Sequence, residues 1–375
     1  MERFLSHDRI ISFHRNKLDV VKFPEDKLNM AYLDNKYSQF LLHLENSEVQ
    51  IDMIKKVIKE IHNQLQCGDE VYNYSIKYPK LLVKIFEFLQ YKSSEHKSDA
   101  ESIRILSSEC FKQFCLILSS KEQLDAYQFI KNIHRTFNDE CEEVRLNIYQ
   151  ALIYYAHSRY GIDSLIDNKI LEQIIDKVNE EQSIRVITLI LTLSKEILNS
   201  AQAPHIALEC NIITYIKKYL DTPDLVLRES VISNFCLISL CEDGKTKCVE
   251  EGGLINNIMK FIKLEYPLSE KEKERCLPIL IASTRFLNNV SILKRAKVEI
   301  WELKGLERFF ELLKNFQDEQ LCLNVFGIIG NVSEEPRARK NLHALWVFMQ
   351  SYIQHDNQLI SEQAEITRNI IYWKP

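Results

Sequence analysis

The sequence predicts an all-α solenoid, that is, a stack of short helical repeats, and three observations support this fold class. Apolar residues recur at helical spacing along most of the chain, and similar helical units follow one another at a nearly constant interval. Only 8 glycines and 8 prolines occur in 375 residues, too few for the many turns of a β-rich fold. The chain is 46% hydrophobic and 27% charged, as expected for a folded protein.

The clearest single repeat spans residues 224–264. Its apolar helical segment, 226–240, is followed by a polar turn at 242–245. A short helix then ends at Gly252-Gly253, where glycines suit the sharp turn. A second amphipathic helix begins at Leu254. The order of long helix, polar turn, short helix, glycine pair and long helix describes one unit of the stack.

The second long helix of each unit gives the period. Successive copies of this helix begin at Ile170, Ile212, Leu254 and Leu306, which are 42, 42 and 52 residues apart. The last interval is longer because it contains a charged insert at 265–275. A period of about 40–47 residues is typical of armadillo and HEAT solenoids. We therefore expect a right-handed superhelical solenoid of about seven repeats.

Weaker copies place the limits of the solenoid. They begin near Leu81, Gln128 and Leu345, with a second polar insert at 92–102. Both inserts fall between repeats, where we expect solvated charged loops. The repeats run from about Ser47 to His355, and a capping helix is expected over 358–372. These limits define a solenoid domain over 46–375.

Residues 1–45 do not match the repeat. Charged and aromatic residues alternate in this segment, and Pro24 divides it. We interpret it as an N-terminal arm that lies along the solenoid surface. A cap on the first repeat and a partner-binding tail are the alternatives.

Composition and charge exclude several classes of function. A net charge of −5 provides no general attraction for nucleic acid or anionic lipid. The chain has no apolar run of 18 residues, so no membrane span is expected, and its first 15 residues are too charged for a signal peptide. The 10 cysteines are scattered without a C-x-x-C pair, which favours buried free thiols in a reducing compartment.

No catalytic or metal-binding signature is present. The chain lacks a phosphate-binding P-loop, a G-x-G-x-x-G turn, a G-x-S-x-G elbow and an H-E-x-x-H pair. The nearest metal-like spacing, His205 with Cys210, has no second pair of ligands. We therefore expect no enzyme activity, no cofactor, no metal and no small-molecule substrate.

Binding of other proteins remains, and the last helix of each repeat should line a concave groove. Aligning these helices selects seven candidate groove residues: Asn147, Gln150, Tyr154, Ile232, Arg285, Asn289 and Asn331. Two aromatic residues near the C-terminus, Tyr372 and Trp373, are candidates for a second contact with a partner.

Residues 47–355 resemble the armadillo superfamily, most clearly at EDGKTKCVEEGGLINNIMKFI and LNVFGIIGNVSEEPRARKNL. Nuclear-import receptors of this superfamily carry tryptophans along the groove; Trp301, Trp346 and Trp373 lie outside it here, which disfavours that function. Two repeats have Asn168-Lys169 and Cys210-Asn211 in place of the glycine pair.

Within the superfamily, the order of features is similar to the armadillo subunits of the axonemal radial spoke. The similarity lies in residues 144–181, in GKTKCVEEGGLI, in LCLNVFGIIGNVSEEPRARKNL and in the tail that ends in an aromatic residue, Lys and Pro. It implies a non-enzymatic scaffold in the cytoplasm, at the axoneme of motile cilia and flagella, whose partners are stalk or neck proteins of the spoke and which contributes to regulation of motility. Two alternatives remain: a soluble regulator, such as a nucleotide exchange factor for Hsp70 or a small GTPase, and a cytosolic assembly adaptor.

Overall fold

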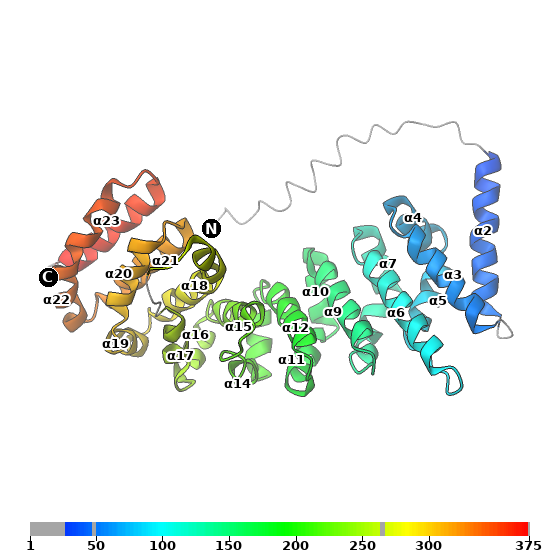
Figure 1. Ribbon diagram of the computed structural model, residues 1–375, viewed down its shortest axis with the longest axis horizontal. Coiled ribbons are helices and arrows are strands. Elements are labelled where there is room, and N and C mark those ends of the chain that lie inside the picture. Colours follow the sequence, from blue (N-terminus) through cyan, green and yellow to red (C-terminus); the bar gives the residue numbers. More distant parts are fainter. Residues whose placement is uncertain (1–26, 47–49, 263–266, 374–375) are drawn as a thin grey trace.

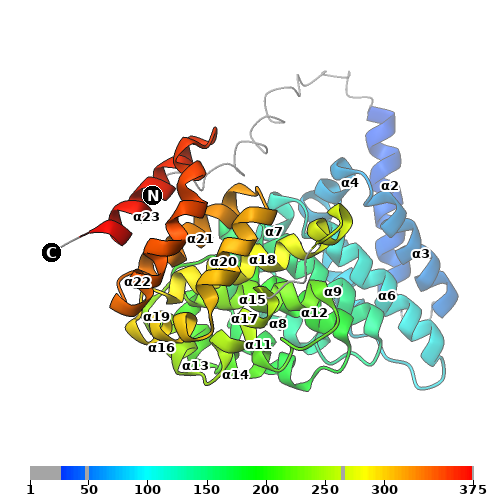
Figure 2. The same ribbon diagram turned by 60° about the vertical axis from the view of Figure 1, so that its left-hand side comes forward.

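The computed structural model describes residues 27–46, 50–262 and 267–373. Every regular element in these ranges is a helix, and the helices form a curved row (Figure 1). The N-terminal and C-terminal ends of the row rise toward the same side, and the rotated view keeps the same order of helices (Figure 2). The predicted all-α solenoid is confirmed.

Seven three-helix repeats make up most of the row. The first helices are α4 (Gly68–Tyr72) with the π-helical turn η1 (Asn73–Lys77), α7 (Leu118–Ala126), α10 (Arg159–Asp167), α13 (Ala203–Glu209), α16 (Glu242–Glu250), α19 (Lys294–Glu302) and α22 (Pro336–Leu345). The second helices are α5 (Pro79–Phe88), α8 (Phe129–Asn132) with η2 (Ile133–Thr136), α11 (Ile170–Glu180), α14 (Ile212–Lys217), α17 (Leu254–Ile262), α20 (Gly305–Asn315) and η3 (Trp346–Gln354).

The third helices are the longest and form the inner layer of the curve. They are α6 (Lys97–Phe114), α9 (Glu142–Ala156), α12 (Ile184–Ile197), α15 (Leu225–Ile238), α18 (Glu270–Val290), α21 (Glu319–Val332) and α23 (Gln358–Tyr372). Each packs on the third helix of the next repeat, and α3 (Ile51–Gln64) packs on α6 in the same way. In Figure 1, α12, α15, α18 and α21 lie inside the curve, whereas α11, α14 and α17 lie outside it. Helix α23 has the bounds expected for a capping helix, and it occupies the third-helix place of the seventh repeat.

The turn before the second helix is the same in five repeats, with or without glycine. The residue that precedes the helix has a left-handed backbone in each case: Gln128 (φ 56°), Lys169 (58°), Asn211 (56°), Gly253 (78°) and Lys304 (56°). Left-handed φ values are rare for residues with a side chain, because Cβ crowds the following carbonyl. Repeats without the glycine pair thus keep the same connection between helices.

The predicted inserts are only partly loops. Residues 92–96 are irregular, but 97–102 form the first turns of α6; similarly, 270–275 belong to α18, and 263–266 lie outside the described residues. Helix α18 begins with a capping box, in which Ser269 accepts from the Glu272 backbone N–H and Glu272 accepts from the Ser269 backbone N–H. The expectation of loops is wrong for these turns; in α18 the reason is the capping box, which starts the third helix early.

Part of the predicted arm is a helix. Helix α2 (Lys27–Glu45) packs on α3 and α5. Tyr37 is only 2% exposed, its ring stacks on Tyr78 at 4.1 Å, and its hydroxyl donates a hydrogen bond to Glu70. Residues 27–45 therefore cap the first repeat rather than lie along the solenoid surface. Residues 1–26 of the predicted arm lie outside the described residues.

Candidate protein-binding groove

The third helices present two register positions to the inside of the curve. Counted back from the end of each helix, the first position lies five or six residues before the last helical residue and contains Gln150, Thr192, Ser233, Arg285, Gly327 and Ile366. One turn later, the second position contains Tyr154, Glu196, Leu237, Asn289, Asn331 and Ile370. Except for Leu237, which is 6% exposed, these residues are half-buried or exposed. Their side chains form the floor of the candidate groove.

Five of the seven predicted groove residues occupy these two positions: Gln150, Tyr154, Arg285, Asn289 and Asn331. Ile232 does not, because its side chain is fully buried, and Ser233 takes its place. The prediction is therefore corrected by one residue in α15. Since successive helical residues are rotated by about 100°, this difference moves a side chain from the groove into the core.

Asn147 also lies beneath the surface and is 5% exposed. Its amide nitrogen donates to Ser108 Oγ at 3.1 Å, and its amide oxygen accepts from Lys112 Nζ at 2.9 Å. Ser108 and Lys112 belong to α6, whereas Asn147 belongs to α9. In this structure Asn147 joins two repeats.

The groove asparagines also connect neighbouring repeats through hydrogen bonds. Asn289 Nδ2 donates to the Cys236 carbonyl and to Ser239 Oγ, both at 3.0 Å, and Asn331 Nδ2 donates to Ser291 Oγ at 2.9 Å. Each amide nitrogen therefore binds the preceding repeat. The amide oxygens have no protein hydrogen bond within the described ranges, so they are the atoms that could accept a hydrogen bond from a bound partner.

A central recess of about 570 Å³ lies in the groove between α12, α15 and α18. Its apolar lining includes Leu237, Leu277, Ile281 and Ala282, and its charged lining consists of Lys195, Glu229, Glu274 and Arg285. Sequence analysis missed Lys195, because α12 carries no asparagine or aromatic residue at the aligned positions. It also missed Pro278 in the wall, although a proline inside a long helix is a visible signal.

The cysteine that lines the central recess is buried and hydrogen-bonded. Cys236 is 2% exposed, and its Sγ donates to the Ala282 carbonyl at 3.0 Å. Burial raises the pKa of the thiol to about 12, even though the nearby Arg285 guanidinium lowers it. A protonated thiol is a poor nucleophile and a poor metal ligand.

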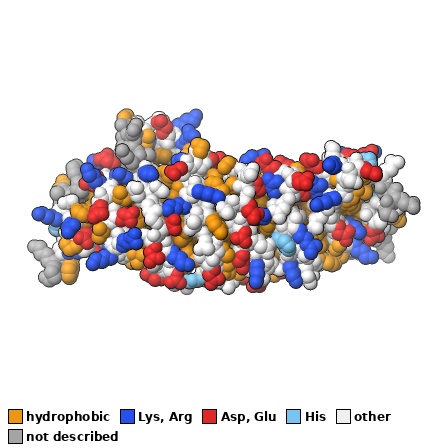
Figure 3. Space-filling view, turned by 90° about the horizontal axis from the view of Figure 1, so that it is seen from below, with side chains coloured by type: hydrophobic (Ala, Val, Ile, Leu, Met, Phe, Trp, Pro, Cys, Tyr) orange, Lys and Arg blue, Asp and Glu red, His pale blue; other side chains and the backbone are white. Residues whose placement is uncertain are grey.

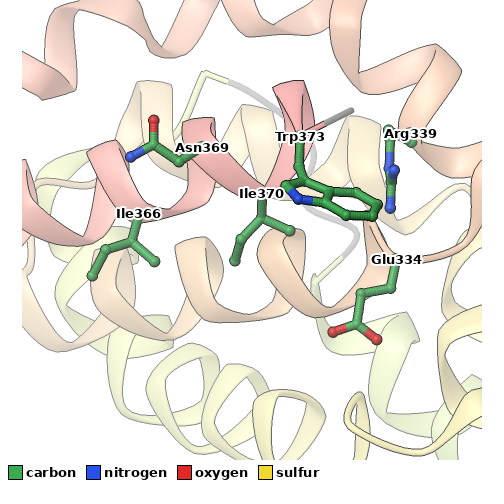
Figure 4. A pocket seen from close by; sticks show the side chains of 6 residues that line it. All are labelled: Glu334, Arg339, Ile366, Asn369, Ile370 and Trp373. Atoms are coloured by element: carbon green, nitrogen blue, oxygen red, sulfur yellow. The ribbon is translucent and has the colours of Figure 1, made fainter. Parts of the chain in front are cut away.

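A second recess of about 490 Å³ lies at the C-terminal end of the groove (Figure 4). It is lined by Glu334, Arg339, Ile366, Asn369, Ile370 and Trp373. The Trp373 ring lies between Ile370 and Arg339, with the guanidinium 5.9 Å from the ring centroid. Trp373 is 60% exposed, so this predicted tail residue lines an open, mostly apolar recess. Tyr372 packs edge-on against His343 at 4.7 Å and is 44% exposed.

On the outside of the curve, the described residues form no patch of a single charge in the view of Figure 3. Figure 3 shows this face with Lys, Arg, Asp and Glu side chains interspersed over its length. Across the ranges that the structure describes, no three His, Cys, Asp or Glu side chains gather as metal ligands would. In the same ranges, none of the helices combines the length and apolar character needed to cross a bilayer.

One buried lysine has a structural explanation. Lys121 is 4% exposed, and its Nζ donates to the carbonyls of Tyr154 at 2.7 Å and Tyr155 at 3.2 Å. Burial lowers the pKa of this amine. These hydrogen bonds cap the C-terminal end of α9, where carbonyls without a helical donor favour a positive charge. Lys121 thus supports the helix that carries Gln150 and Tyr154.

The comparisons with known proteins support the fold. No protein-family model matches this chain, and no curated protein matches it. Among solved structures, an engineered protein has a TM-score of 0.64 at 10% identity and covers 91% of this chain and 100% of its own. Two designed armadillo repeat proteins, one for modular peptide recognition and one in complex with the peptide (KR)4, have TM-scores of 0.54 and 0.53 at 17% and 15% identity. Each covers 65% of this chain and 98% of its own length. The chain therefore has an armadillo-like solenoid fold.

Proposed function

We propose that this chain is a non-enzymatic protein-binding scaffold and, more specifically, an armadillo subunit of the axonemal radial spoke. The observation that carries the general proposal is the groove itself. Six consecutive third helices present half-exposed polar and apolar side chains along it, with two open recesses. Such a surface fits an elongated protein segment better than a small molecule, which binds in an enclosing cavity.

The specific proposal rests on the sequence resemblance. Four stretches, which include 144–181 and the repeat that contains Asn331, are similar in order to radial spoke head protein 14. A stacked solenoid suits a permanent assembly, because it is stiff and offers separate faces to several neighbours. We propose stalk or neck proteins of the spoke as the partners. The groove and residues 1–26 of the predicted N-terminal arm would clasp helical or extended segments of these proteins.

Fractionation of motile cilia that carry the tagged protein tests this proposal. We expect the protein to stay with the axoneme after detergent extraction and to leave it only at a salt concentration that releases spokes. Crosslinking of the released spokes should then connect groove residues such as Gln150 and Arg285 to another spoke subunit. Crosslinks confined to the second helices would contradict the role of the groove.

Recovery of the protein only in the detergent-soluble fraction would contradict the axonemal role. It would favour a soluble regulator or an assembly adaptor. A regulator of Hsp70 or of a small GTPase should bind its target reversibly and accelerate nucleotide release. That assay, performed on the same purified protein, separates the two remaining functions.

A further inference from the structure

Two cations in the central recess have no partner. Lys195 from α12 and Arg285 from α18 line the recess from opposite sides of α15. Both are half-buried, and neither side chain makes a hydrogen bond or an ion pair to any other described residue. Their situation differs from that of Arg104, Arg145 and Lys217, which are each paired with a carboxylate in the stack. Because partial burial without a partner is unfavourable for a charge, these two cations are suited to an anionic ligand.

The acidic residues of the recess do not neutralise these cations directly. Glu229 accepts a hydrogen bond from the Ser233 hydroxyl at 2.7 Å. Glu274 lies on the exposed early turns of α18, where water screens its charge. Neither carboxylate forms an ion pair with Lys195 or Arg285. The four charged side chains of the recess are therefore not paired with one another, and Glu274 is the most exposed of them.

Pro278 adds a main-chain acceptor to the same recess. A proline has no N–H, so the carbonyl four residues earlier, that of Glu274, lacks its helical donor. Both residues line the recess. A free carbonyl in a groove wall can accept an N–H from an added peptide chain, as the edge of a sheet does. The recess thus offers donors at Lys195 and Arg285 and an acceptor at residue 274.

The floor between these polar groups is apolar. Leu237, Ile281 and Ala282 line it, and the Ala282 carbonyl is already bound by the Cys236 thiol. An apolar side chain that enters the recess would remove apolar surface from water, which favours binding. A ligand that combines a carboxylate with a neighbouring apolar side chain matches both parts of the lining.

We propose that the central recess binds an acidic, leucine-like segment of a protein partner, with carboxylates at Lys195 and at Arg285 and an apolar side chain on the floor of the recess. This inference rests on the proposed function as a protein-binding scaffold and specifies its partner. The guanidinium of Arg285 supplies the paired donors that a carboxylate prefers. A segment rich in Lys and Arg would instead meet like charge at Lys195 and Arg285. The groove should therefore discriminate against a peptide such as (KR)4, which one of the designed armadillo proteins binds.

Fluorescence anisotropy with the full-length protein tests the proposal. The probes are three labelled octapeptides: alternating Glu and Leu, alternating Gln and Leu, and (KR)4. We expect the acidic peptide to bind at least tenfold more tightly than either of the others, and its affinity to fall as salt is raised. The double variant Lys195→Glu/Arg285→Glu should weaken binding of the acidic peptide at least tenfold.

The matched control is Lys131→Glu/Arg135→Glu, which makes the same change in net charge. Both residues are exposed and lie on α8 and η2, the second helix of its repeat. This control should keep the affinity for the acidic peptide within twofold, and circular dichroism should show that both double variants remain folded. Equal loss in the two variants would overturn the proposal, because it would show a general effect of charge.

Preference for the neutral or the basic peptide, or failure of the acidic peptide to bind, would also overturn it. These results leave the axonemal role standing, because fractionation does not depend on the chemistry of the central recess. Conversely, the protein could be absent from axonemes and still bind the acidic peptide through Lys195 and Arg285. That result would contradict the radial-spoke proposal, and the proposal for the central recess would stand.

Discussion

Five residues with left-handed backbones set the direction of the second helix in their repeats. Gly253 accommodates this conformation without strain, whereas Lys169 and Lys304 adopt it with a side chain present. A left-handed residue other than glycine costs roughly 1–2 kcal/mol. The surrounding helices compensate for this cost in the native state. The turn is therefore a property of the stack and not of the glycine pair.

Replacing Lys169 by glycine should raise the free energy of unfolding by about 0.5–1 kcal/mol, since relief of strain exceeds the added freedom of the unfolded chain. Thermal unfolding monitored by circular dichroism measures the effect. The control is Lys247→Gly at an exposed position of α16, where the substitution should lower the free energy of unfolding by about 1 kcal/mol. A decrease in stability for Lys169→Gly would mean that the lysine side chain itself supports the turn.

At the scale of residues, the sequence predicts which kinds of residue line the groove better than it predicts which way each side chain points. The groove positions of Gln150, Tyr154, Arg285, Asn289 and Asn331 follow from helical period alone. The position in α15 was wrong by one residue, because Ile232 and Ser233 are both compatible with an apolar helix. Only packing against the neighbouring helices decides which of them is buried. The hydrogen bonds of Asn147 to α6 likewise depend on contacts between repeats that no local pattern encodes.

At the scale of helices, ion pairs connect the third helix of one repeat to the loop that precedes the next third helix. Arg104 binds Asp139 through two contacts at 2.7 and 3.2 Å, and Arg145 binds Glu181 at 2.9 and 3.1 Å. These pairs are 10–15% exposed, and their geometry is bidentate. They are therefore expected to contribute more to stability than the exposed pairs along single helices.

The Glu181 pair predicts a dependence of stability on pH. Burial disfavours the charge of this carboxylate, but the Ser183 N–H and the Arg145 guanidinium outweigh burial and hold its pKa below the ordinary value of 4.5. Because the folded pKa is depressed, this contribution to stability is present above about pH 4.5 and is lost as pH falls through the folded pKa.

Glu181→Gln should therefore lower the thermal midpoint at pH 7, and its difference from the wild type should shrink as the pH is lowered below 4.5. Glu180→Gln is the matched control, because its carboxylate is 64% exposed and pairs only with Lys177 one turn away. Its midpoint should stay close to that of the wild type at pH 7. Equal shifts for both variants at every pH would mean that the Arg145 contact contributes nothing specific.

The bounds of the helices show what sequence can predict at this scale. The capping box at Ser269 and Glu272 is a visible start signal, yet the high charge of 265–275 favours the interpretation as a loop. Charge density describes exposure to water, and an exposed helical turn meets that condition as well as a loop does. Helix α2 was missed for a different reason. Its contact depends on Tyr37 reaching Tyr74 and Tyr78 in the first repeat.

At the scale of the whole molecule, each third helix packs on the next, so interactions are mainly between neighbours. Such proteins can unfold in parts, with terminal repeats opening before central ones. Different contacts stabilise the repeats at the N-terminal and the C-terminal end of the solenoid. Tyr37 on α2 covers the first repeat, and at the other end Phe326 of α21, in the sixth repeat, meets the Tyr352 ring of the seventh repeat edge-on at 5.3 Å.

This difference leads to a prediction about where the molecule loses structure. Tyr37→Ala and Phe326→Ala each remove a large buried ring, at a cost of about 3–5 kcal/mol. Hydrogen exchange followed by mass spectrometry should show that Tyr37→Ala reduces protection in α3, α5 and α6 and leaves α20 to α23 unchanged. Phe326→Ala should give the reverse pattern, so each variant is the control for the other. Loss of protection along the whole chain in both variants would indicate one cooperative unit. In that case a partner bound at either recess would stabilise every repeat, whereas local unfolding would confine its effect to the neighbouring ones.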